Sequence, residues 1–342
     1  MQVIKSLESC DFQESLDYYE KYCKSLDASR IVITGASGFI GNWLVETLTQ
    51  ISKEFNSNFE LVLLGRSEKK LRNQLSISVP SNVQIHEVDI SRGSVGLGEV
   101  THVIHAATPT NPPHGSESTT LEASYNGAIN LMKSIGDSIQ KPTFINLSSG
   151  AVYGKQSLDS KHQSLLLSTS VSLNEQNFGD EYMNAKIITE QLIKENTLNG
   201  KIIGTNARLF AFYGPLLPID DKYAIGNFMY SCLKGEKINI QTKGQSVRSY
   251  LHASHLASQL IYLLGKPIPG ECHLGSTFAK PIHWWATYVS ELFGRSIEVT
   301  GIQSEIPSFY APTNDERIPV VDESEETRER LFRSWFQWLK SH

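Results

Sequence analysis

The sequence predicts an α/β protein in which a doubly wound parallel sheet is followed by a smaller C-terminal lobe. Between residues 30 and 215, short β-branched runs alternate with helical stretches, as in a parallel sheet whose strands are joined through helices. After residue 215, prolines break this alternation into short helices and strands. We therefore expect a helical extension over residues 1–29, a sheet domain over 30–215, and a lobe over 216–342 that can return segments to the sheet domain.

Length and composition describe an ordinary globular protein. The chain has 342 residues, of which 40% are hydrophobic and 20% charged, with a formal net charge of −5. This balance offers no basic field for nucleic acid or for an acidic membrane. Charged residues interrupt the N-terminal segment where a secretory signal needs an unbroken apolar core, and no apolar run reaches membrane-spanning length. We expect a cytoplasmic protein without a nucleic-acid or membrane partner.

The N-terminal extension holds a helix of its own. Helical spacing runs from Phe12 to Leu26 and gathers four side chains on one side, namely Leu16, Tyr19, Tyr22 and Cys23. The favoured interpretation is an extra helix packed on the surface. A dimerisation or partner-binding element is the alternative.

A glycine-rich turn joins the first strand of the sheet domain to its first helix. The strand is the run Ile31–Thr34, and helical spacing follows from Asn42 to Gln50. Between them, Gly35 permits the tight turn, Gly38 lets backbone approach a pyrophosphate, and Gly41 lets helix and strand pack closely. The helix N-terminus adds free N–H donors for the anion, so this segment predicts a dinucleotide-binding site.

Five more strand candidates follow along the sheet domain, separated by helical stretches. Their β-branched and apolar composition suits the buried strands of a parallel sheet. The candidates are Leu61–Leu64, Val83–Val88, His102–His105, Thr143–Leu147 and Lys201–Ala207.

Tyr182 and Lys186 are one helical turn apart and therefore lie on the same face of a helix. A phenol, with an unperturbed pKa of about 10, is a poor acid or base at neutral pH. We expect the ammonium of Lys186 to favour the phenolate in a partly desolvated site and so to lower the pKa of Tyr182. Combined with the glycine-rich turn, this pair indicates a redox enzyme.

In combination, these features resemble the extended short-chain dehydrogenase/reductase family, the NAD(P)-dependent epimerases, dehydratases and reductases of nucleotide sugars. The resemblance runs from about residue 30 to about residue 321 and keeps the family's order of motifs. It implies a Rossmann-like domain, a smaller C-terminal lobe that binds a nucleotide-sugar substrate, and a homodimer. The matching segments are Gly35–Gly41, Asp89–Ile90, His105–Ala107, Asn126, Leu147–Gly154, Tyr182 with Lys186, Arg208–Pro215 and Val247–His252.

The resemblance also assigns roles to single residues. Ser149 would bind the substrate oxygen, Tyr182 would exchange its proton, and Lys186 would tune Tyr182 and hold the nicotinamide ribose. Asn126 would support the active-site backbone. The implied cofactor-binding residues are Gly35, Ser37, Gly38, Phe39, Ile40, Gly41, Arg66, Asp89, Ile90, Ala106, Ala107, Tyr182 and Lys186. The implied substrate-binding residues are Thr108, Ser149, Tyr153, Asn227, Arg248 and Arg317, the two arginines being suited to a diphosphate.

The end of the second strand bears on the choice of cofactor. NAD sites normally place an acid there for the ribose hydroxyls, whereas NADP sites use a cation. Arg66 stands at this point, with Ser67 and Lys69 as helpers, so we expect NADP, with NAD as the alternative. No metal is expected, because the cysteines lack metal-ligand spacing and are predicted to be reduced thiols. They are Cys10, Cys23, Cys232 and Cys272.

Departures from the family bear on the reaction. Family 4,6-dehydratases usually carry an acidic pair where this chain has Gly150 and Ala151, and without carboxylates acid/base elimination lacks its groups. Ala211 replaces an asparagine that often reaches the nucleotide sugar. We predict reduction of a 4-keto-6-deoxy sugar nucleotide with hydride from NADPH. The alternatives are 4-epimerisation with tightly bound NAD, then 4,6-dehydration or reduction of a small ketone, and, from another class, a non-catalytic dinucleotide sensor.

Overall fold

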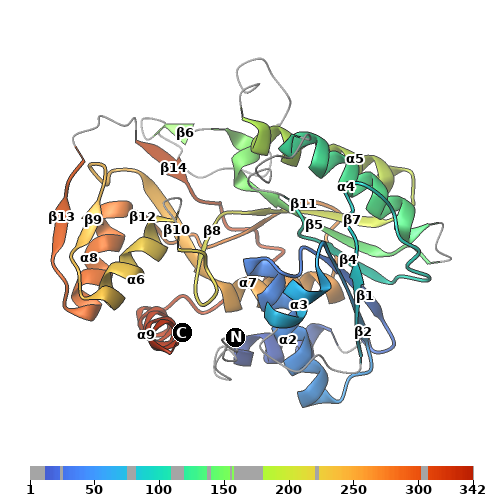
Figure 1. The fold of residues 1–342 in the computed structure, drawn as a ribbon, viewed down its shortest axis with the longest axis horizontal. Coiled ribbons are helices and arrows are strands. Elements are labelled where there is room, and N and C mark those ends of the chain that lie inside the picture. Colours follow the sequence, from blue (N-terminus) through green and yellow to red (C-terminus); the bar gives the residue numbers. More distant parts are fainter. Residues whose placement is uncertain are drawn as a thin grey trace.

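The computed structural model describes residues 12–23, 26–74, 82–108, 119–136, 140–154, 156–157, 180–219, 223–301 and 307–341. Its centre is a seven-stranded sheet in the order β11-β7-β5-β4-β1-β2-β3, in which neighbouring strands are parallel. The chain runs outward from β1 to β3, then crosses back to β4 and continues to β11 (Figure 1). The predicted doubly wound fold is confirmed. The strands are β1 (Arg30–Thr34), β2 (Glu60–Gly65), β3 (Val83–Glu87), β4 (His102–His105), β5 (Thr143–Ser149), β7 (Ile203–Leu209) and β11 (Gly270–Leu274).

Helices cover both faces of this sheet (Figure 1). Successive side chains of β1 point to opposite faces, so Ile31 and Ile33 enter one core while Val32 enters the other. The Ile31 face is covered by α1, α2 and α7, and the Val32 face by α4 and α5. These helices, with the short α3, are α1 (Gln13–Tyr22), α2 (Phe39–Phe55), α3 (Glu68–Gln74), α4 (Thr120–Ile135), α5 (Glu181–Leu198) and α7 (Ala253–Gly265).

The predicted elements of the sheet domain agree with the structure to within a few residues. The strand predicted at His102–His105 is β4, and the strand predicted at Lys201–Ala207 is β7, shifted by two residues at each end. The helix predicted at Asn42–Gln50 is the middle of α2. It begins earlier, at Phe39, because Gly38 in an extended conformation serves as its N-cap.

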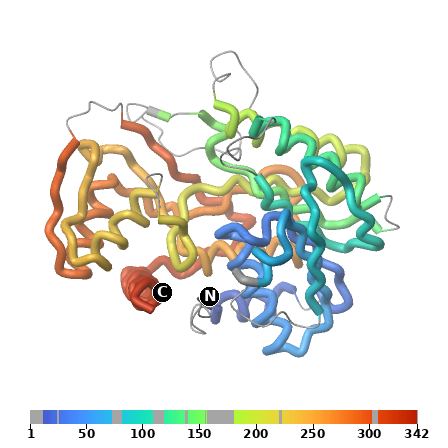
Figure 2. Tube along the Cα trace, in the orientation of Figure 1, coloured from blue at the N-terminus to red at the C-terminus, as the bar shows by residue number. Residues whose placement is uncertain are grey.

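The C-terminal lobe lies at one end of the sheet domain (Figure 2). Its core packs Phe228 and Met229 of α6 against Trp285 of α8 and Trp335 of α9. From β10 the chain returns to the sheet domain as α7 and β11 before it re-enters the lobe. The remaining elements are the 3₁₀ helix η3 (Gly150–Tyr153), β6 (Gln156–Ser157), β8 (Ala211–Tyr213), α6 (Ala224–Lys234), β9 (Ile238–Ile240), β10 (Val247–His252), β12 (Ala279–Pro281), α8 (Ile282–Phe293), β13 (Ile297–Val299), β14 (Ser308–Tyr310) and α9 (Glu325–Lys340).

The helix expected near the N-terminus is α1, which packs against α2 and α7. Tyr19 is fully buried there, and its hydroxyl hydrogen-bonds to the Ser57 hydroxyl at 2.6 Å. Cys23 donates from its thiol to the Ile261 carbonyl at 2.9 Å. The packing agrees with an extra helix on the domain surface, while a role of this helix in dimerisation stays a prediction.

Three observations concern partners and cofactors. Within the described ranges, no helix is both long and apolar enough to cross a membrane. The same residues contain no group of three or more side chains arranged to hold a metal ion. Cys23, Cys232 and Cys272 are buried free thiols, as predicted, whereas Cys10 lies outside the described residues.

Candidate active site

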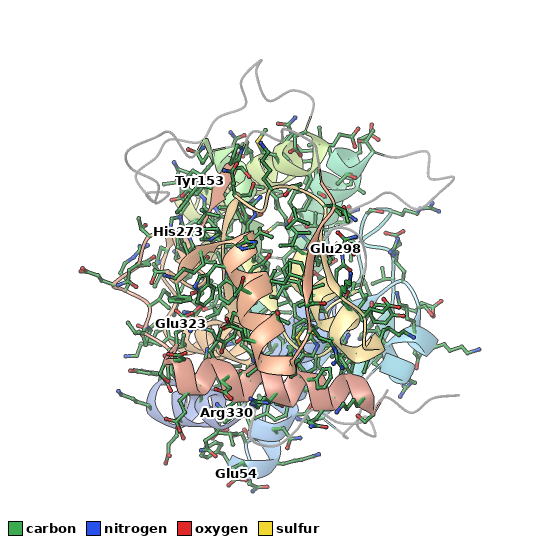
Figure 3. The ribbon with its side chains drawn as sticks, turned by 90° about the vertical axis from the view of Figure 1, so that its left-hand side faces the viewer. Glu54, Tyr153, His273, Glu298, Glu323 and Arg330 are labelled. Atoms are coloured by element: carbon green, nitrogen blue, oxygen red, sulfur yellow. The ribbon has the colours of Figure 1, made fainter. Side chains whose placement is uncertain are left out.

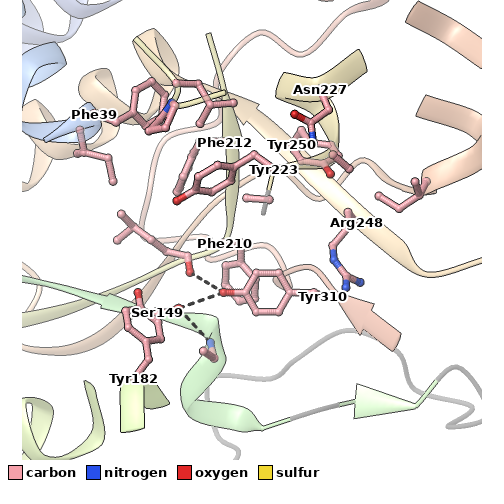
Figure 4. Close-up of a pocket in the computed structure, with 18 of the residues that line it drawn as sticks. Phe39, Ser149, Tyr182, Phe210, Phe212, Tyr223, Asn227, Arg248, Tyr250 and Tyr310 are labelled. Carbon is pink, nitrogen blue, oxygen red and sulfur yellow. Dashed lines mark hydrogen bonds between the residues drawn. The ribbon is translucent and has the colours of Figure 1, made fainter. Parts of the chain in front are cut away.

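A cavity of about 1070 Å³ lies where the carboxyl ends of β1, β4 and β5 face the C-terminal lobe. Ligands of open α/β sheets bind at this edge, next to the point where the strand order reverses. The sheet domain contributes the glycine-rich turn, Ser149, Tyr182 and Lys186, and the lobe contributes residues of α6, β9, β10 and β14. Figure 4 shows Ser149 and Tyr182 at one end of this cavity and Arg248 and Asn227 toward the other.

The glycine-rich turn presents bare backbone to the cavity. Gly35 has a positive φ of 66°, and a Cβ there would lie 2.8 Å from the backbone of Ala106. A Cβ on Gly41 would lie 2.2 Å from the Gly35 carbonyl oxygen, so neither position accepts a side chain. The N-terminus of α2 has no side-chain cap, which leaves its N–H groups available to an anion. These features fit the pyrophosphate of a dinucleotide.

Thr34 joins the turn to the end of β4. Its hydroxyl accepts hydrogen bonds from the backbone N–H groups of Ala106 and Ala107, at 3.2 and 3.1 Å. Of these two predicted cofactor residues, Ala106 lines the cavity. Ser37, Ala107, Arg66, Asp89 and Ile90 were also predicted for the cofactor, but they are not part of the cavity lining. Arg66 is exposed just beyond the end of β2.

The first turns of α5 position Tyr182 and Lys186. Asp180 caps the helix by accepting from the Met183 N–H at 2.9 Å. Lys186 donates from its ammonium to the Leu147 carbonyl at 2.6 Å and to the Thr108 hydroxyl at 2.9 Å. Its nitrogen lies 5.6 Å from the centre of the Tyr182 ring. Burial lowers the pKa of Lys186 to about 8, against the attraction of Glu190.

The pKa of Tyr182 differs from the sequence-based expectation. Burial raises it above the ordinary value for a phenol, and the hydrogen bond with Ser149 opposes this rise only in part. In the protein without ligands the pKa of Tyr182 is therefore raised, because burial outweighs the hydrogen bond with Ser149. The lowering expected from Lys186 together with a bound nicotinamide stays a prediction. The phenol keeps its proton, as a proton donor must.

Ser149 ends β5 at the floor of the cavity. Its hydroxyl accepts from the Ala151 N–H at 3.1 Å and hydrogen-bonds to the Tyr310 hydroxyl at 3.1 Å (Figure 4). Tyr310 comes from β14 of the lobe, 161 residues further along the chain. Sequence reasoning missed Tyr310, since nothing in its local sequence indicates a partner so distant.

A buried polar cluster lies behind Ser149. The Ser148 hydroxyl donates to Glu190 at 2.5 Å, and Arg208 forms two hydrogen bonds with the same carboxylate, at 2.9 and 2.7 Å. Arg208 also donates to the Tyr153 hydroxyl, which hydrogen-bonds to His273 at 2.7 Å (Figure 3). Tyr153 is therefore part of this cluster and is not in the cavity lining, contrary to its predicted contact with substrate.

Of the two arginines predicted for a diphosphate, Arg248 lines the cavity and Arg317 does not. Arg248 donates to the carbonyl oxygens of Val247 and Ser308 and to the Ser308 hydroxyl, which fixes its guanidinium at the cavity edge. Arg317 instead pairs with Asp315 at 2.7 Å and donates to the Glu271 carbonyl. An acid two residues away holds the Arg317 guanidinium outside the cavity, so its contact with a diphosphate stays a prediction. Thr108 and Asn227 line the cavity as expected.

The lining also includes residues to which the sequence analysis assigned no role. They add aromatic rings and carboxamides, which suit a ligand with flat and polar parts. These residues include Phe210, Phe212, Tyr223, Tyr230, Asn239, Gln241, Tyr250 and Tyr310. Among the described residues that line the cavity, none is an aspartate or a glutamate.

This chain is similar to known proteins in its sequence. A model of the NAD dependent epimerase/dehydratase family matches residues 31–274. UDP-glucuronic acid decarboxylase 5 of Arabidopsis thaliana is 25% identical over 291 residues, which span 83% of this chain and 80% of that protein.

Two solved structures show the same fold at low identity. UDP-N-acetylglucosamine 4-epimerase of Methanobrevibacter ruminantium M1 is 19% identical with a TM-score of 0.76, covering 92% of this chain and 99% of its own. dTDP-glucose 4,6-dehydratase of Bacillus anthracis str. Ames, solved with NAD, is 18% identical with a TM-score of 0.72, covering 92% and 97%.

Proposed function

Because the chain belongs to the NAD dependent epimerase/dehydratase family, we propose that it reduces a 4-keto-6-deoxy nucleotide sugar by hydride transfer from a nicotinamide cofactor. The proposal combines three side chains that suit exchange of a hydride and a proton with a cavity whose described lining holds no carboxylate for elimination. The coarser part, an enzyme of nucleotide-sugar chemistry, follows from the family. The direction and the substrate are the proposal.

The observation that carries the proposal is the absence of a carboxylate from the described cavity lining. Removal of a hydroxyl as water needs a general acid and a general base beside the sugar, whereas reduction of a ketone needs a hydride and one proton. At Gly150, a Cβ would lie 2.4 Å from Cε1 of Phe210. The ring of Phe210 therefore fills the space that an acidic side chain at this position would need.

The chain's own residues supply the remaining chemistry. When bound, the cofactor supplies the hydride. Ser149 polarises the ketone oxygen by donating its hydroxyl proton in a hydrogen bond, and Tyr182 transfers its proton to the oxygen as the carbon is reduced. The raised pKa of Tyr182 keeps the phenol protonated for this step. Lys186, now bonded to Thr108 and Leu147, holds a ribose hydroxyl with its ammonium.

At the other end of the cavity, Arg248 binds the diphosphate of the sugar nucleotide. Asn227, which lines the same end, contacts the nucleoside. A guanidinium suits phosphate because it forms paired, charge-assisted hydrogen bonds. Arg66 favours NADP, since it is an exposed cation directly after β2, where NADP sites carry a positive charge. NAD is the alternative, and the Bacillus anthracis dehydratase was solved with it. By resemblance to the family, we also propose that the protein forms a homodimer.

The experiment offers the purified protein NADPH and NADH separately, each with a panel of 4-keto nucleotide sugars, and follows the absorbance of the reduced nicotinamide. Tyr182→Phe should lower kcat by about 10²- to 10⁴-fold, the usual contribution of a positioned acid or base. Tyr288→Phe is the matched control, because the Tyr288 hydroxyl is buried without a hydrogen-bond partner among the described residues and does not line the cavity. Full turnover by a folded Tyr182→Phe variant would remove the mechanism.

A further inference from the structure

Tyr310 connects the C-terminal lobe to the catalytic end of the cavity. It ends β14, where its backbone pairs with Arg248 of β10, and its hydroxyl lies 3.1 Å from the Ser149 hydroxyl. The same hydroxyl donates to the Leu209 carbonyl at 3.3 Å. Figure 4 shows the ring between Ser149 and Arg248, with the hydroxyl directed at Ser149.

The Ser149 hydroxyl has two phenolic neighbours, Tyr310 and Tyr182, with which it can share a proton. Each hydroxyl has one proton, and the Ser149 oxygen already accepts from the Ala151 N–H. When Tyr310 donates to Leu209, Ser149 can donate to Tyr310, and its proton is then not available to a substrate. When Tyr310 donates to Ser149 instead, the Ser149 oxygen accepts from two donors, and its own proton is directed toward Tyr182, with which it shares a hydrogen bond, or toward a substrate oxygen in the cavity.

Neither hydrogen bond of Tyr310 has the short distance of a strong one. Hydroxyl-to-oxygen hydrogen bonds are shortest and strongest near 2.7–2.8 Å. The contacts of Tyr310 with Leu209 and Ser149, at 3.3 and 3.1 Å, are both longer than this, so neither holds the phenolic proton firmly. A ketone oxygen that accepts from Ser149 would tip the balance, because hydrogen bonds in a chain strengthen one another.

We propose that Tyr310 is a positioning residue that turns the Ser149 hydroxyl proton toward the substrate oxygen by donating its own proton to Ser149. The inference deepens the proposed function and rests on it. It also explains how the serine is activated in a cavity whose described lining holds no carboxylate.

The surroundings of Tyr310 hold its ring in place and keep its hydroxyl protonated. The Phe210 ring packs against it with centroids 5.1 Å apart, and the Arg248 guanidinium lies 5.9 Å from its centroid. Burial raises the pKa of Tyr310 above its ordinary value, so the phenol remains a donor across the working range of pH. The Tyr310 side chain therefore contacts both Arg248, which would bind a diphosphate, and Ser149, whose hydroxyl it orients.

A double-mutant cycle tests the inference. Tyr310→Phe removes the hydroxyl and keeps the ring, and we expect kcat for the ketone to fall about three- to tenfold, as for the loss of one neutral hydrogen bond. The KM of the nucleotide sugar should stay within about twofold. In a Ser149→Ala background, Tyr310→Phe should have no further effect on kcat. Tyr288→Phe is again the control. An unchanged or raised kcat in Tyr310→Phe, or an equal loss in both backgrounds, would overturn the inference.

A second readout does not depend on turnover. In protein labelled with ¹³C at the Cζ atom of tyrosine, the Tyr310 resonance is the one lost in Tyr310→Phe. It should shift in Ser149→Ala and again when cofactor and nucleotide sugar bind, but not in Tyr288→Phe. A resonance that ignores Ser149→Ala overturns the inference even in an active enzyme. If the Tyr310 resonance shifts in Ser149→Ala but the protein turns over no nucleotide sugar, the proposed function is rejected. The hydrogen bond between Tyr310 and Ser149 is then still established.

Discussion

The buried pair of Glu190 and Arg208 gives a prediction whose size follows from the structure. Their side chains are only 7% and 4% exposed, and two hydrogen bonds join them at 2.7 and 2.9 Å. Arg208→Met would leave the carboxylate of Glu190 buried without its cation, which costs about 3–5 kcal/mol of the free energy of unfolding. Replacing both members with apolar residues, in Glu190→Leu with Arg208→Met, should recover part of that loss, because no buried carboxylate is left without its guanidinium. The recovery is incomplete because the buried Lys186 ammonium loses the attraction of Glu190.

The assay is urea unfolding followed by tryptophan fluorescence, with kcat measured on the folded variants. Arg333→Met is the matched control, because Arg333 pairs with Glu329 at 2.7 Å on the surface of α9, where both side chains are about half exposed. Loss of such a pair should cost less than about 1 kcal/mol. The reasoning is refuted if Arg208→Met costs no more than Arg333→Met, or if the double variant is the least stable of the set.

Three further predictions follow from the cofactor end of the site. Since the pKa of Lys186 is lowered to about 8 from an ordinary 10.5, kcat/KM should fall as pH rises through 8. Between these values Lys186 binds fewer protons in the folded than in the unfolded chain, so the free energy of unfolding of the wild type relative to Lys186→Met should rise from pH 8 to 10.5, the buried thiols and phenols contributing alike to both proteins. Gly41→Ala would place a Cβ 2.2 Å from a backbone oxygen and should abolish cofactor quenching of tryptophan fluorescence, whereas Gly93→Ala, with nothing within 4 Å of its Cβ, should leave it intact. Arg66→Glu should raise the KM for NADPH by about tenfold or more, the usual value of a hydrogen bond to a charged group, and leave the KM for NADH nearly unchanged; equal effects on both would contradict a 2′-phosphate contact.

The fold could be predicted from the sequence because its signals are local. The apolar run of β1 and the helical spacing of α2 stand a few residues apart in the sequence. The structure confirms that the glycines between them are required by close backbone contacts. The same holds for Tyr182 and Lys186, since helical spacing alone puts them on one face. The structure then brings this face, Ser149 and the glycine-rich turn into a single cavity.

The parts that could not be predicted depend on contacts between distant segments. Tyr310 contacts Ser149 although the two are 161 residues apart in the sequence, and nothing in the sequence of β14 predicts this contact. Two residues predicted to bind substrate, Arg317 and Tyr153, lie outside the cavity lining, and each has a polar partner that the sequence could have indicated. Asp315, two residues before Arg317, was a nearby competitor for its guanidinium. Glu190, one turn beyond Lys186, continued the catalytic face of α5 and marked the buried cluster that holds Tyr153.

The central claim, hydride transfer to a nucleotide sugar without elimination, is tested most directly with NADPH that carries deuterium at the transferred position. We predict that the cofactor is oxidised in a one-to-one ratio with a 4-keto-6-deoxy nucleotide sugar, and that the deuterium is found at carbon 4 of the product by NMR. Interconversion of 4-epimers without net oxidation, or loss of water from a 4-hydroxy sugar, would contradict the account and identify an epimerase or a dehydratase instead.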